Sequence, residues 1–185
     1  MLLLPNIDSA IVVLTNTLSL NDTPNWVAQL VLEEMLEVPD KNDYVAAART
    51  SVAENAKWYA NISDELSRNR KTDTSPKKLE DYTGTYWDAI HVVKIEVSLE
   101  DGNLYWALQG LRSEKFSLEH YEHDTFTWLQ PRNDLARRGR WVDQGADFWK
   151  LRFEVNNGGQ IEKVFWVHDN GVPAVEYKKI AKGAM

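Results

Sequence analysis

The hydrophobic pattern of the chain changes near residue 79. Before that position, apolar residues recur every three or four positions, a spacing that predicts amphipathic helices. After it, apolar and polar residues alternate in short runs separated by turn residues, which predicts strands with one buried face. The pattern therefore predicts two unlike parts, one mainly helical and one mainly β.

The first part opens with a short β-branched run at Ala10–Leu14, which predicts one buried strand. Asp22-Thr23-Pro24 is a typical helix start, because a capping side chain precedes a proline in the first turn, and the apolar stripe then predicts a helix to about Glu37. A second helical stripe runs from Asn42 to Leu66. The polar stretch that follows, residues 67–78, is typical of a linker.

The second part, residues 79–185, has strand patterns with no helix between them, so we predict an N-terminal strand–helix–helix segment at 1–66, a linker at 67–78 and a β domain at 79–185. Turn signals such as Asp101-Gly102-Asn103 separate the strands. This spacing favours a sandwich or a closed up-and-down barrel. The eight predicted strands are Tyr82–Ala89, Val93–Leu99, Leu104–Leu108, Lys115–Tyr121, Asp124–Leu129, Asp147–Val155, Ile161–His168 and Ala174–Lys179.

The composition narrows the function classes. The 185 residues include no cysteine, which excludes a disulfide scaffold, a Cys-ligated metal site and a thiol nucleophile. The net charge of −7 and the absence of a basic block argue against nucleic-acid binding. No apolar stretch reaches the roughly 18 residues that span a membrane, and no Lys or Arg precedes Lys41, so we expect no targeting segment and a cytoplasmic protein.

Several segments resemble the end of the serine β-lactamase-related fold, the family of class C β-lactamases, D-aminopeptidases and related esterases. Pro5–Asn16 resembles the last core strand of that fold, and Trp26–Leu36 resembles the helix that closes it. The resemblance implies an α+β, mainly β fold that ends in the lipocalin-like, eight-stranded antiparallel β-barrel carried by many of these hydrolases, particularly fungal ones. The segments that resemble landmarks of this barrel are Leu79–Tyr86, His120–Phe126, Arg137–Arg140 and Trp166–Asp169.

The catalytic motifs of that family lie N-terminal to the part that the chain resembles: Ser-x-x-Lys, Tyr-x-Asn and Lys/His-Thr-Gly. Ser75–Lys78 matches the first pattern, but it lies in the polar linker and its proline opposes a helix. Tyr59–Asn61 matches the second within a helical stripe, and Lys71–Asp73 lacks the glycine of the third. We therefore expect no serine-hydrolase activity from this chain by itself.

A lone Ala10–Leu14 strand would leave its backbone donors and acceptors unpaired, which is costly when they are buried. It must pair with its own copy, add to the edge of the barrel or fray. The apolar face of the Trp26–Met35 helix also needs a cover. We favour a homodimer formed through the N-terminal strand and helix.

Large aromatic residues are the first candidates for a binding site. Six of the eight tryptophans lie in the barrel part, where they either fill the core or line a cavity for a hydrophobic small molecule. Trp106 shares a strand face with Leu104 and Leu108, and Trp166 shares one with Val164, so both are expected to point inward. The predicted ligand-binding residues are Tyr86, Trp87, Trp106, Trp128 and Trp166.

The polar candidates lie in the same part. His120 and His168 are natural acid/base groups near neutral pH, and Arg137 or Arg138 could hold an anion in a bidentate clamp. Glu176, in the last predicted strand, could pair with an arginine across the barrel. His120 and His123 are three residues apart and point to opposite faces of a strand, so we expect no metal site and no cofactor.

Two functions follow from these residues. The first is a module that binds a hydrophobic small molecule or mediates assembly, without catalysis. The second is a stand-alone barrel enzyme of natural-product biosynthesis, an isomerase, cyclase or pericyclase that needs only a shaped apolar pocket and one or two polar groups. Convergence of His120, His168 and Glu176 on a cavity would favour the enzyme. An interior filled solidly with aromatic side chains would argue against both small-molecule binding and catalysis, and would favour interaction with a partner.

Overall fold

The computed structural model describes residues 1–16, 21–139 and 144–180. The chain forms two compact units, Met1–Asn61 and Ile62–Met185. Arg140, which belongs to one predicted barrel landmark, and Trp141, one of the six barrel tryptophans, lie outside the described residues. None of the helices in the described ranges combines the length and the apolar character that crossing a bilayer requires.

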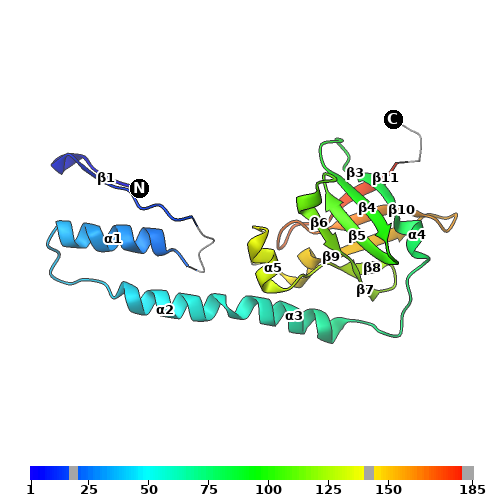
Figure 1. Ribbon diagram of the computed structural model, residues 1–185, viewed down its shortest axis with the longest axis horizontal. Helices are drawn as coiled ribbons and strands as arrows, with labels where there is room; N and C mark the ends of the chain where they lie inside the picture. Colours follow the sequence, from blue (N-terminus) through cyan, green and yellow to red (C-terminus); the bar gives the residue numbers. More distant parts are fainter. Residues whose placement is uncertain (17–20, 140–143, 181–185) are drawn as a thin grey trace. The chain divides into compact units, whose positions relative to one another are not determined.

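The N-terminal unit opens with a β-hairpin instead of a lone strand (Figure 1). Strand β1 (Leu2–Leu4) pairs antiparallel with β2 (Ser9–Ile11), and the 3-10 turn η1 (Pro5–Ile7) connects them. The chain reverses because Asp8 adopts a left-handed backbone conformation with φ of 48°. The prediction of an unpaired strand at Ala10–Leu14 is therefore wrong: the strand ends at Ile11 and its partner comes from the preceding residues.

Three helices follow the hairpin. Helix α1 (Thr23–Met35) has Pro24 in its first turn, as predicted. Helix α2 (Tyr44–Asn55) begins where the Asp43 side chain accepts the Ala46 backbone N–H at 2.8 Å. Helix α3 (Lys57–Asn69) follows after a break at Ala56, so the single stripe predicted from Asn42 to Leu66 is two helices. The apolar spacing continues across the break, and for this reason the sequence pattern does not mark it.

The C-terminal unit contains a sheet of nine antiparallel strands among its described residues, preceded by the short helix α4 (Leu79–Tyr82). The strand order is β6-β5-β4-β3-β11-β10-β9-β8-β7, so every hairpin joins neighbours. The strands are β3 (Gly84–Trp87), β4 (Lys94–Glu100), β5 (Asn103–Leu108), β6 (Lys115–Ser117), β7 (Glu119–Glu122), β8 (Thr125–Thr127), β9 (Lys150–Val155), β10 (Ile161–Trp166) and β11 (Val175–Lys179).

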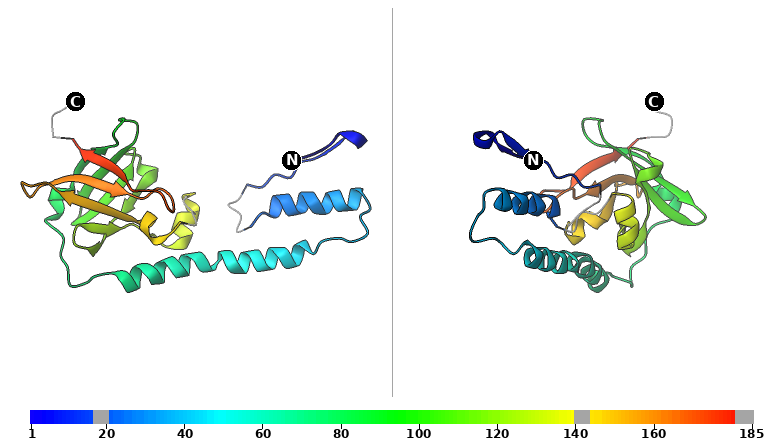
Figure 2. Two further views of the ribbon diagram at one scale, coloured as in Figure 1. Left: turned by 180° about the vertical axis from the view of Figure 1, so that it is seen from behind. Right: turned by 60° about the vertical axis from the view of Figure 1, so that its left-hand side comes forward.

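The sheet curves into a nearly closed barrel because its two edge strands are one continuous segment (Figures 1 and 2). Strand β6 pairs with β5, and Leu118 continues this pairing by donating its N–H to the Leu104 carbonyl at 2.9 Å. Directly after Leu118, β7 pairs with β8 on the other side. The single strand predicted at Lys115–Tyr121 is thus divided in two, which accounts for nine strands where eight were expected.

Successive hairpins place their loops at alternate ends of this antiparallel barrel. One end, which we call the α4 end, holds helix α4 and the tight turns at 101–102, 123–124 and 156–160. The opposite end, the α5 end, holds the loops at 88–93, 109–114 and 167–174 and the β8–β9 connection. That connection carries helix α5 (Arg132–Arg137) and the 3-10 helix η3 (Ala146–Trp149).

Candidate functional site

The barrel interior near the α5 end is filled by indole rings. Trp106 packs edge-to-face against Trp128 at 5.0 Å and against Trp166 at 5.1 Å between ring centroids. Trp149 lies 4.6 Å from Trp128, and Phe116 lies 5.1 Å from the same ring. We call Trp106, Trp128, Trp149 and Trp166 the indole cluster. Its members contact one another, so this half of the interior is a packed core.

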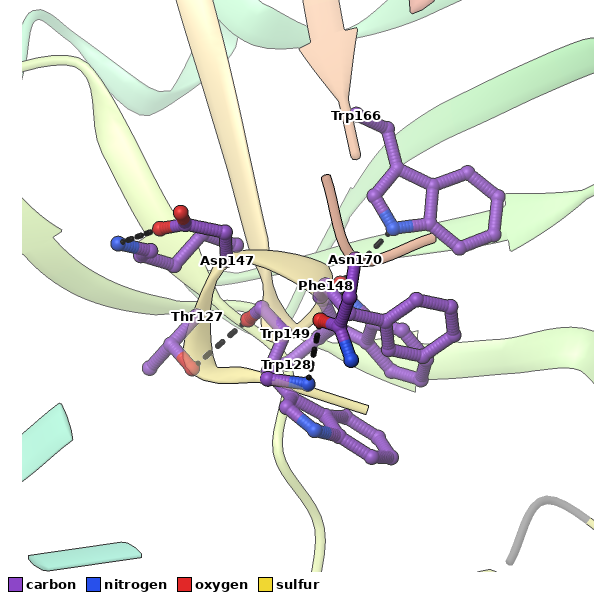
Figure 3. Close-up of polar contacts among 9 residues, drawn as sticks. Thr127, Trp128, Asp147, Phe148, Trp149, Trp166 and Asn170 are labelled. Carbon is purple, nitrogen blue, oxygen red and sulfur yellow. Dashed lines mark hydrogen bonds and ion pairs between the residues drawn. The ribbon is translucent and has the colours of Figure 1, made fainter. Parts of the chain in front are cut away.

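Helix η3 fixes the indole cluster by backbone hydrogen bonds (Figure 3). The Phe148 carbonyl accepts the indole N–H of Trp128 at 3.1 Å and that of Trp166 at 2.8 Å. The Trp149 carbonyl accepts the Thr127 hydroxyl at 2.9 Å. Two carbonyls of one short helix thus satisfy donors from β8 and from the end of β10, which closes the barrel at this end.

The other half of the interior is also packed with aromatic rings. Tyr82 lies 4.9 Å from Phe126 and 5.0 Å from Phe153, and Tyr86 lies 5.8 Å from Phe153. Tyr86 is fully buried and its hydroxyl donates to the Tyr82 carbonyl at 2.6 Å. Burial raises the pKa of the Tyr86 hydroxyl, which therefore stays protonated. Tyr86 belongs to this core.

Trp87, the next residue on β3, lies outside the barrel interior. Its indole ring stacks on the His91 imidazole at 5.6 Å with an interplanar angle of 13°. The Lys94 ammonium group lies 5.9 Å from the same ring. Because successive strand residues point to opposite faces, Tyr86 and Trp87 cannot line one cavity.

A pocket of about 420 Å³ opens at the α4 end of the barrel. The residues before and in α4, the β4–β5 turn and the segment around Leu118 surround it. The apolar residues of its lining are Leu79, Leu104, Leu118 and Phe126, of which the last three are buried. Its other lining residues are Pro76, Lys77, Lys78, Gly102, Asn103 and His120.

The ionisable side chains that line the pocket are Lys77, Lys78 and His120, and none of them is acidic. Neither lysine has a carboxylate partner among the residues that the structure describes. The His120 Nε2 atom lies 2.9 Å from the His123 carbonyl, which can only accept, so Nε2 carries a proton.

The predicted linker is attached to the barrel and positions these residues. The Lys71 backbone N–H donates to the Tyr121 carbonyl at 3.2 Å, and the Thr74 hydroxyl accepts the His123 N–H at 2.9 Å. The Lys77 N–H donates to the Tyr82 hydroxyl at 2.8 Å. That hydroxyl also donates to the carboxylate of Asp124. The backbone at Lys77 is therefore held against the pocket by the barrel itself.

The five predicted catalytic residues do not share one site. His120 lies on β7 beside the pocket at the α4 end. His168 lies in the β10–β11 loop at the α5 end, and Arg137 and Arg138 lie at the end of α5. The Glu176 carboxylate forms an ion pair with Lys163 at 3.1 Å, instead of pairing with an arginine across the barrel.

His168 has a defined partner at the α5 end. Its Nε2 atom lies 2.7 Å from the Tyr177 hydroxyl, and its ring centroid lies 4.2 Å from that of Trp166. Burial lowers the pKa of the His168 imidazole and raises the pKa of the Tyr177 hydroxyl to about 12. The pair is therefore neutral at physiological pH.

The two predicted anion-clamp arginines bind neighbouring groups. Arg137 forms an ion pair with Asp134 at 2.9 Å on the same helix. The Arg138 guanidinium lies 3.7 Å from the centre of the Phe116 ring, and its Nε donates to the Ser113 carbonyl at 3.2 Å. Arg138 thus joins α5 to the loop before β6 and packs over the Phe116 ring.

Comparison with known families assigns the barrel. Residues 68–181 match the family described as "Domain of unknown function (DUF3471)". The chain belongs to the DUF3471 family. The match begins near the end of α3 and takes in the attached linker, the pocket and every strand of the barrel. A search of curated proteins finds no match to this chain.

The pocket of this DUF3471 domain contains residues that sequence reasoning missed. Lys77 and Lys78 lie in a stretch that composition marks as a polar linker, and Asn103 lies in a turn signal. The one local sign that the two lysines could belong to a site was their position directly before Leu79, where the strand pattern begins. Of the predicted site residues, His120 alone lines the pocket.

Within the described ranges, no group of three His, Asp or Glu side chains is placed to hold a metal ion. The ionisable residues of the pocket lining are two lysines and one histidine.

Proposed function

We propose that this DUF3471 domain is a non-catalytic binding module that takes an apolar small molecule into the pocket at its α4 end. The observation that carries the proposal is the contrast between a barrel interior filled with aromatic rings and a pocket of about 420 Å³ whose lining includes both apolar and polar residues. A ligand of drug-like size needs a hollow of several hundred Å³. The packed interior favours binding at the barrel end over binding inside the barrel.

We further propose that the module is an accessory barrel of the lipocalin-like kind found in β-lactamase-related hydrolases, particularly fungal ones. The nearly closed antiparallel barrel and the segments Leu79–Tyr86 and Trp166–Asp169 support this relation. The lack of the three catalytic motifs in the sequence supports a role without serine-hydrolase activity. A cytoplasmic location stays a prediction.

The alternative function, a cofactor-independent isomerase or cyclase, has weaker support. Such an enzyme needs an acid/base group and a charge-stabilising group within hydrogen-bond reach of one substrate. His120 and His168 lie at opposite ends of the barrel, and Glu176 is engaged by Lys163. Mass spectrometry of a bound molecule before and after incubation distinguishes the two functions, because only an enzyme changes its structure.

Assembly is a second candidate function, and the N-terminal unit favours it. Val27, Leu30 and Val31 of α1 are each about two-fifths exposed, and Leu3 of the hairpin is more exposed still. Exposed apolar groups of this kind mark interaction surfaces. A homodimer formed through the hairpin and α1 would cover them, and sedimentation equilibrium of the full chain at several concentrations would detect it. A concentration-independent monomer contradicts the dimer.

The binding function can be tested with the neutral apolar fluorophore N-phenyl-1-naphthylamine. We expect saturable fluorescence enhancement with the wild-type chain. The variant Asn103→Phe, which adds a bulky ring at an exposed pocket residue, is expected to weaken binding at least about five-fold, since the ring occupies ligand space.

Glu162→Phe is the matched control, because it adds the same ring at an exposed strand position away from the pocket. Circular dichroism would confirm that both variants keep the fold. Equal binding by wild type and Asn103→Phe would place the fluorophore elsewhere, on the exposed face of α1 for example, and would contradict the proposed site.

A further inference from the structure

We propose that Asn170 is a site of self-catalysed modification, at which the folded chain converts its own asparagine amide to a carboxylate. The sequence contains the dipeptide Asn-Gly twice, as Asn157-Gly158 and as Asn170-Gly171. Glycine leaves the backbone nitrogen after the asparagine open to approach by the side chain, because it has no Cβ. The two dipeptides differ in their hydrogen bonds, and this difference assigns the reaction to Asn170. The inference does not depend on the pocket or on its ligand.

The reaction needs water as its one co-reactant. The backbone nitrogen of Gly171 attacks Cγ of Asn170 and closes a succinimide ring. The Cγ–Nδ2 bond breaks, and the amide nitrogen leaves as ammonia together with the proton of the Gly171 N–H. Water then opens the ring. Cleavage at Cγ gives aspartate, whereas cleavage at the main-chain carbonyl carbon gives isoaspartate, in which the chain continues through the side chain.

Both dipeptides occupy the central positions of a β-turn. The Gly159 N–H donates to the Asn156 carbonyl at 3.0 Å across the first turn, and the Val172 N–H donates to the Asp169 carbonyl at 3.4 Å across the second. All four residues of the two dipeptides are exposed, so water reaches both sites. Neither the position in a turn nor access to water distinguishes the two asparagines.

The attacking nitrogen is restrained at the first site. The Gly158 N–H donates to Asn156 Oδ1 at 2.9 Å, and it must lose this bond before its nitrogen can attack the Asn157 side chain. The Gly171 N–H donates no hydrogen bond to the residues that the structure describes. The nitrogen of Gly171 is therefore the more available nucleophile.

The attacked carbonyl is assisted at the second site. Asn170 Oδ1 accepts the backbone N–H of Gly145, directly before η3, at 3.1 Å (Figure 3). Attack on Cγ places negative charge on Oδ1, and an N–H donor at this oxygen stabilises that charge as the donors of an oxyanion hole do. The Asn157 side chain has no hydrogen-bond partner within the described ranges. Both differences favour reaction at Asn170.

The reaction changes the α5 end of the barrel. The Asn170 contact joins the β10–β11 loop to η3, whose Phe148 carbonyl accepts the indole N–H groups of Trp128 and Trp166. Isoaspartate inserts a methylene group into the backbone of this loop, and either product adds a negative charge next to Asp169. Chains with an altered α5 end therefore accumulate with time.

Peptide mapping by mass spectrometry on the full chain measures both sites at once. The folded chain is incubated at mildly alkaline pH in water enriched in heavy oxygen, which separates reaction during incubation from reaction during digestion. We expect Asn170 to react at least about five-fold faster than Asn157. In guanidinium chloride we expect the two rates to agree within about two-fold, because unfolding removes the hydrogen bonds and leaves the same dipeptide.

Two variants test the two hydrogen bonds separately. In Gly145→Ala, the new Cβ atom would lie 2.8 Å from Asn170 Oδ1, so the side chain must move away and its reaction is expected to slow about five-fold. In Asn156→Ala, the Gly158 N–H loses its acceptor, and Asn157 is expected to react about five-fold faster. The other Asn-Gly peptide is the internal control for each variant, and circular dichroism checks that each variant keeps the fold.

Equal rates at the two sites of the folded chain, or a faster reaction at Asn157, overturn the assignment. A preference for Asn170 that persists in guanidinium chloride also overturns it, because the preference would then come from the neighbouring sequence. An unchanged Asn170 rate in folded Gly145→Ala overturns the role of the N–H donor. If Gly145→Ala fails to fold, Asn156→Ala and the comparison of folded with unfolded chain decide the proposal.

Discussion

The neighbours Tyr86 and Trp87 show how a single step along a strand decides the role of a residue. Sequence reasoning placed both in a ligand-binding wall, yet Tyr86 is buried in the core and Trp87 stacks on His91 outside it. The alternation of strand side chains requires this separation once one of the two is known to face inward. The strand pattern could have predicted that the two differ, but only the assembled barrel shows which one lies inside.

His168 is the residue whose environment couples stability to pH. Burial lowers the pKa of its imidazole below the usual 6.5, so the unfolded chain binds the proton more readily than the folded one. The stabilisation is complete above about pH 6.5 and declines as the pH falls below that value. We expect the free energy of unfolding of His168→Gln to depend less on pH between pH 7 and pH 5 than that of the wild type.

Urea denaturation at several pH values would measure this difference. His123→Gln, which replaces an exposed histidine, serves as the matched control. The prediction fails if His168→Gln and the wild type lose the same free energy of unfolding over this range. Because the comparison is between variants, contributions from carboxylates are common to both and cancel.

At the scale of elements, the strand positions are well predicted and the strand boundaries are not. Each of the eight predicted strands overlaps an observed one, because alternation of apolar and polar residues is a local property. The division of Lys115–Tyr121 at Leu118 arises from pairing with β5 on one side and β8 on the other. Pairing partners far apart in sequence leave no mark in the local pattern.

The hairpin β1–β2 also shows that a local sequence pattern does not reveal which strands pair. The run at Ala10–Leu14 predicts a strand, but its partner β1 lies at Leu2–Leu4, where the sequence pattern predicts no element. The prediction of a dimer through strand pairing followed from the assumption that this strand has no partner within its own chain. With a local partner present, the remaining argument for a dimer is the exposed apolar side chains, such as Leu30 of α1.

Gly84 begins β3 with a φ of +144°, a backbone conformation that residues with a Cβ rarely adopt. A Cβ atom built there would lie 2.8 Å from Cε of Lys179, which can move because it is near the end of a flexible side chain. The main cost of Gly84→Ala is therefore backbone strain, of about 1–3 kcal/mol. Chemical denaturation is expected to show a loss of stability of that size.

Gly158→Ala is the control for this variant, because Gly158 lies in a turn of the same unit and does not have a positive φ. Its effect is expected to be within about 0.5–1 kcal/mol of zero. Equal losses for the two variants would show that the conformation at Gly84 is not the source of the cost.

At the scale of the whole molecule, the two units differ in how completely they bury apolar side chains. The barrel unit encloses Trp106, Trp149 and Tyr86 almost fully, whereas the N-terminal unit leaves Val45 and Leu36 more than half exposed. Local stability follows the burial of apolar contacts. The barrel unit is therefore expected to be the more stable of the two.

Hydrogen exchange followed by mass spectrometry on the full chain tests this expectation. We expect backbone amides in β4, β5, β9 and β10 to exchange at least about ten-fold more slowly than those in α1 and α2, since their opening requires loss of the barrel core. Exchange rates that are equal in the two units would indicate that the N-terminal unit is protected by an additional contact, and would strengthen the case for assembly.

The sequence by itself determined the class of the fold, α+β and mainly β, and the inward direction of Trp106 and Trp166. These features depend on local periodicity, which each segment carries independently. Only the tertiary structure decided that the indole rings fill the interior, that Lys77 and Lys78 meet Leu104 and His120 at one pocket, and that His168 lies at the other end of the barrel. The reason is that such groupings depend on strand order and barrel closure, which bring together residues far apart in the chain.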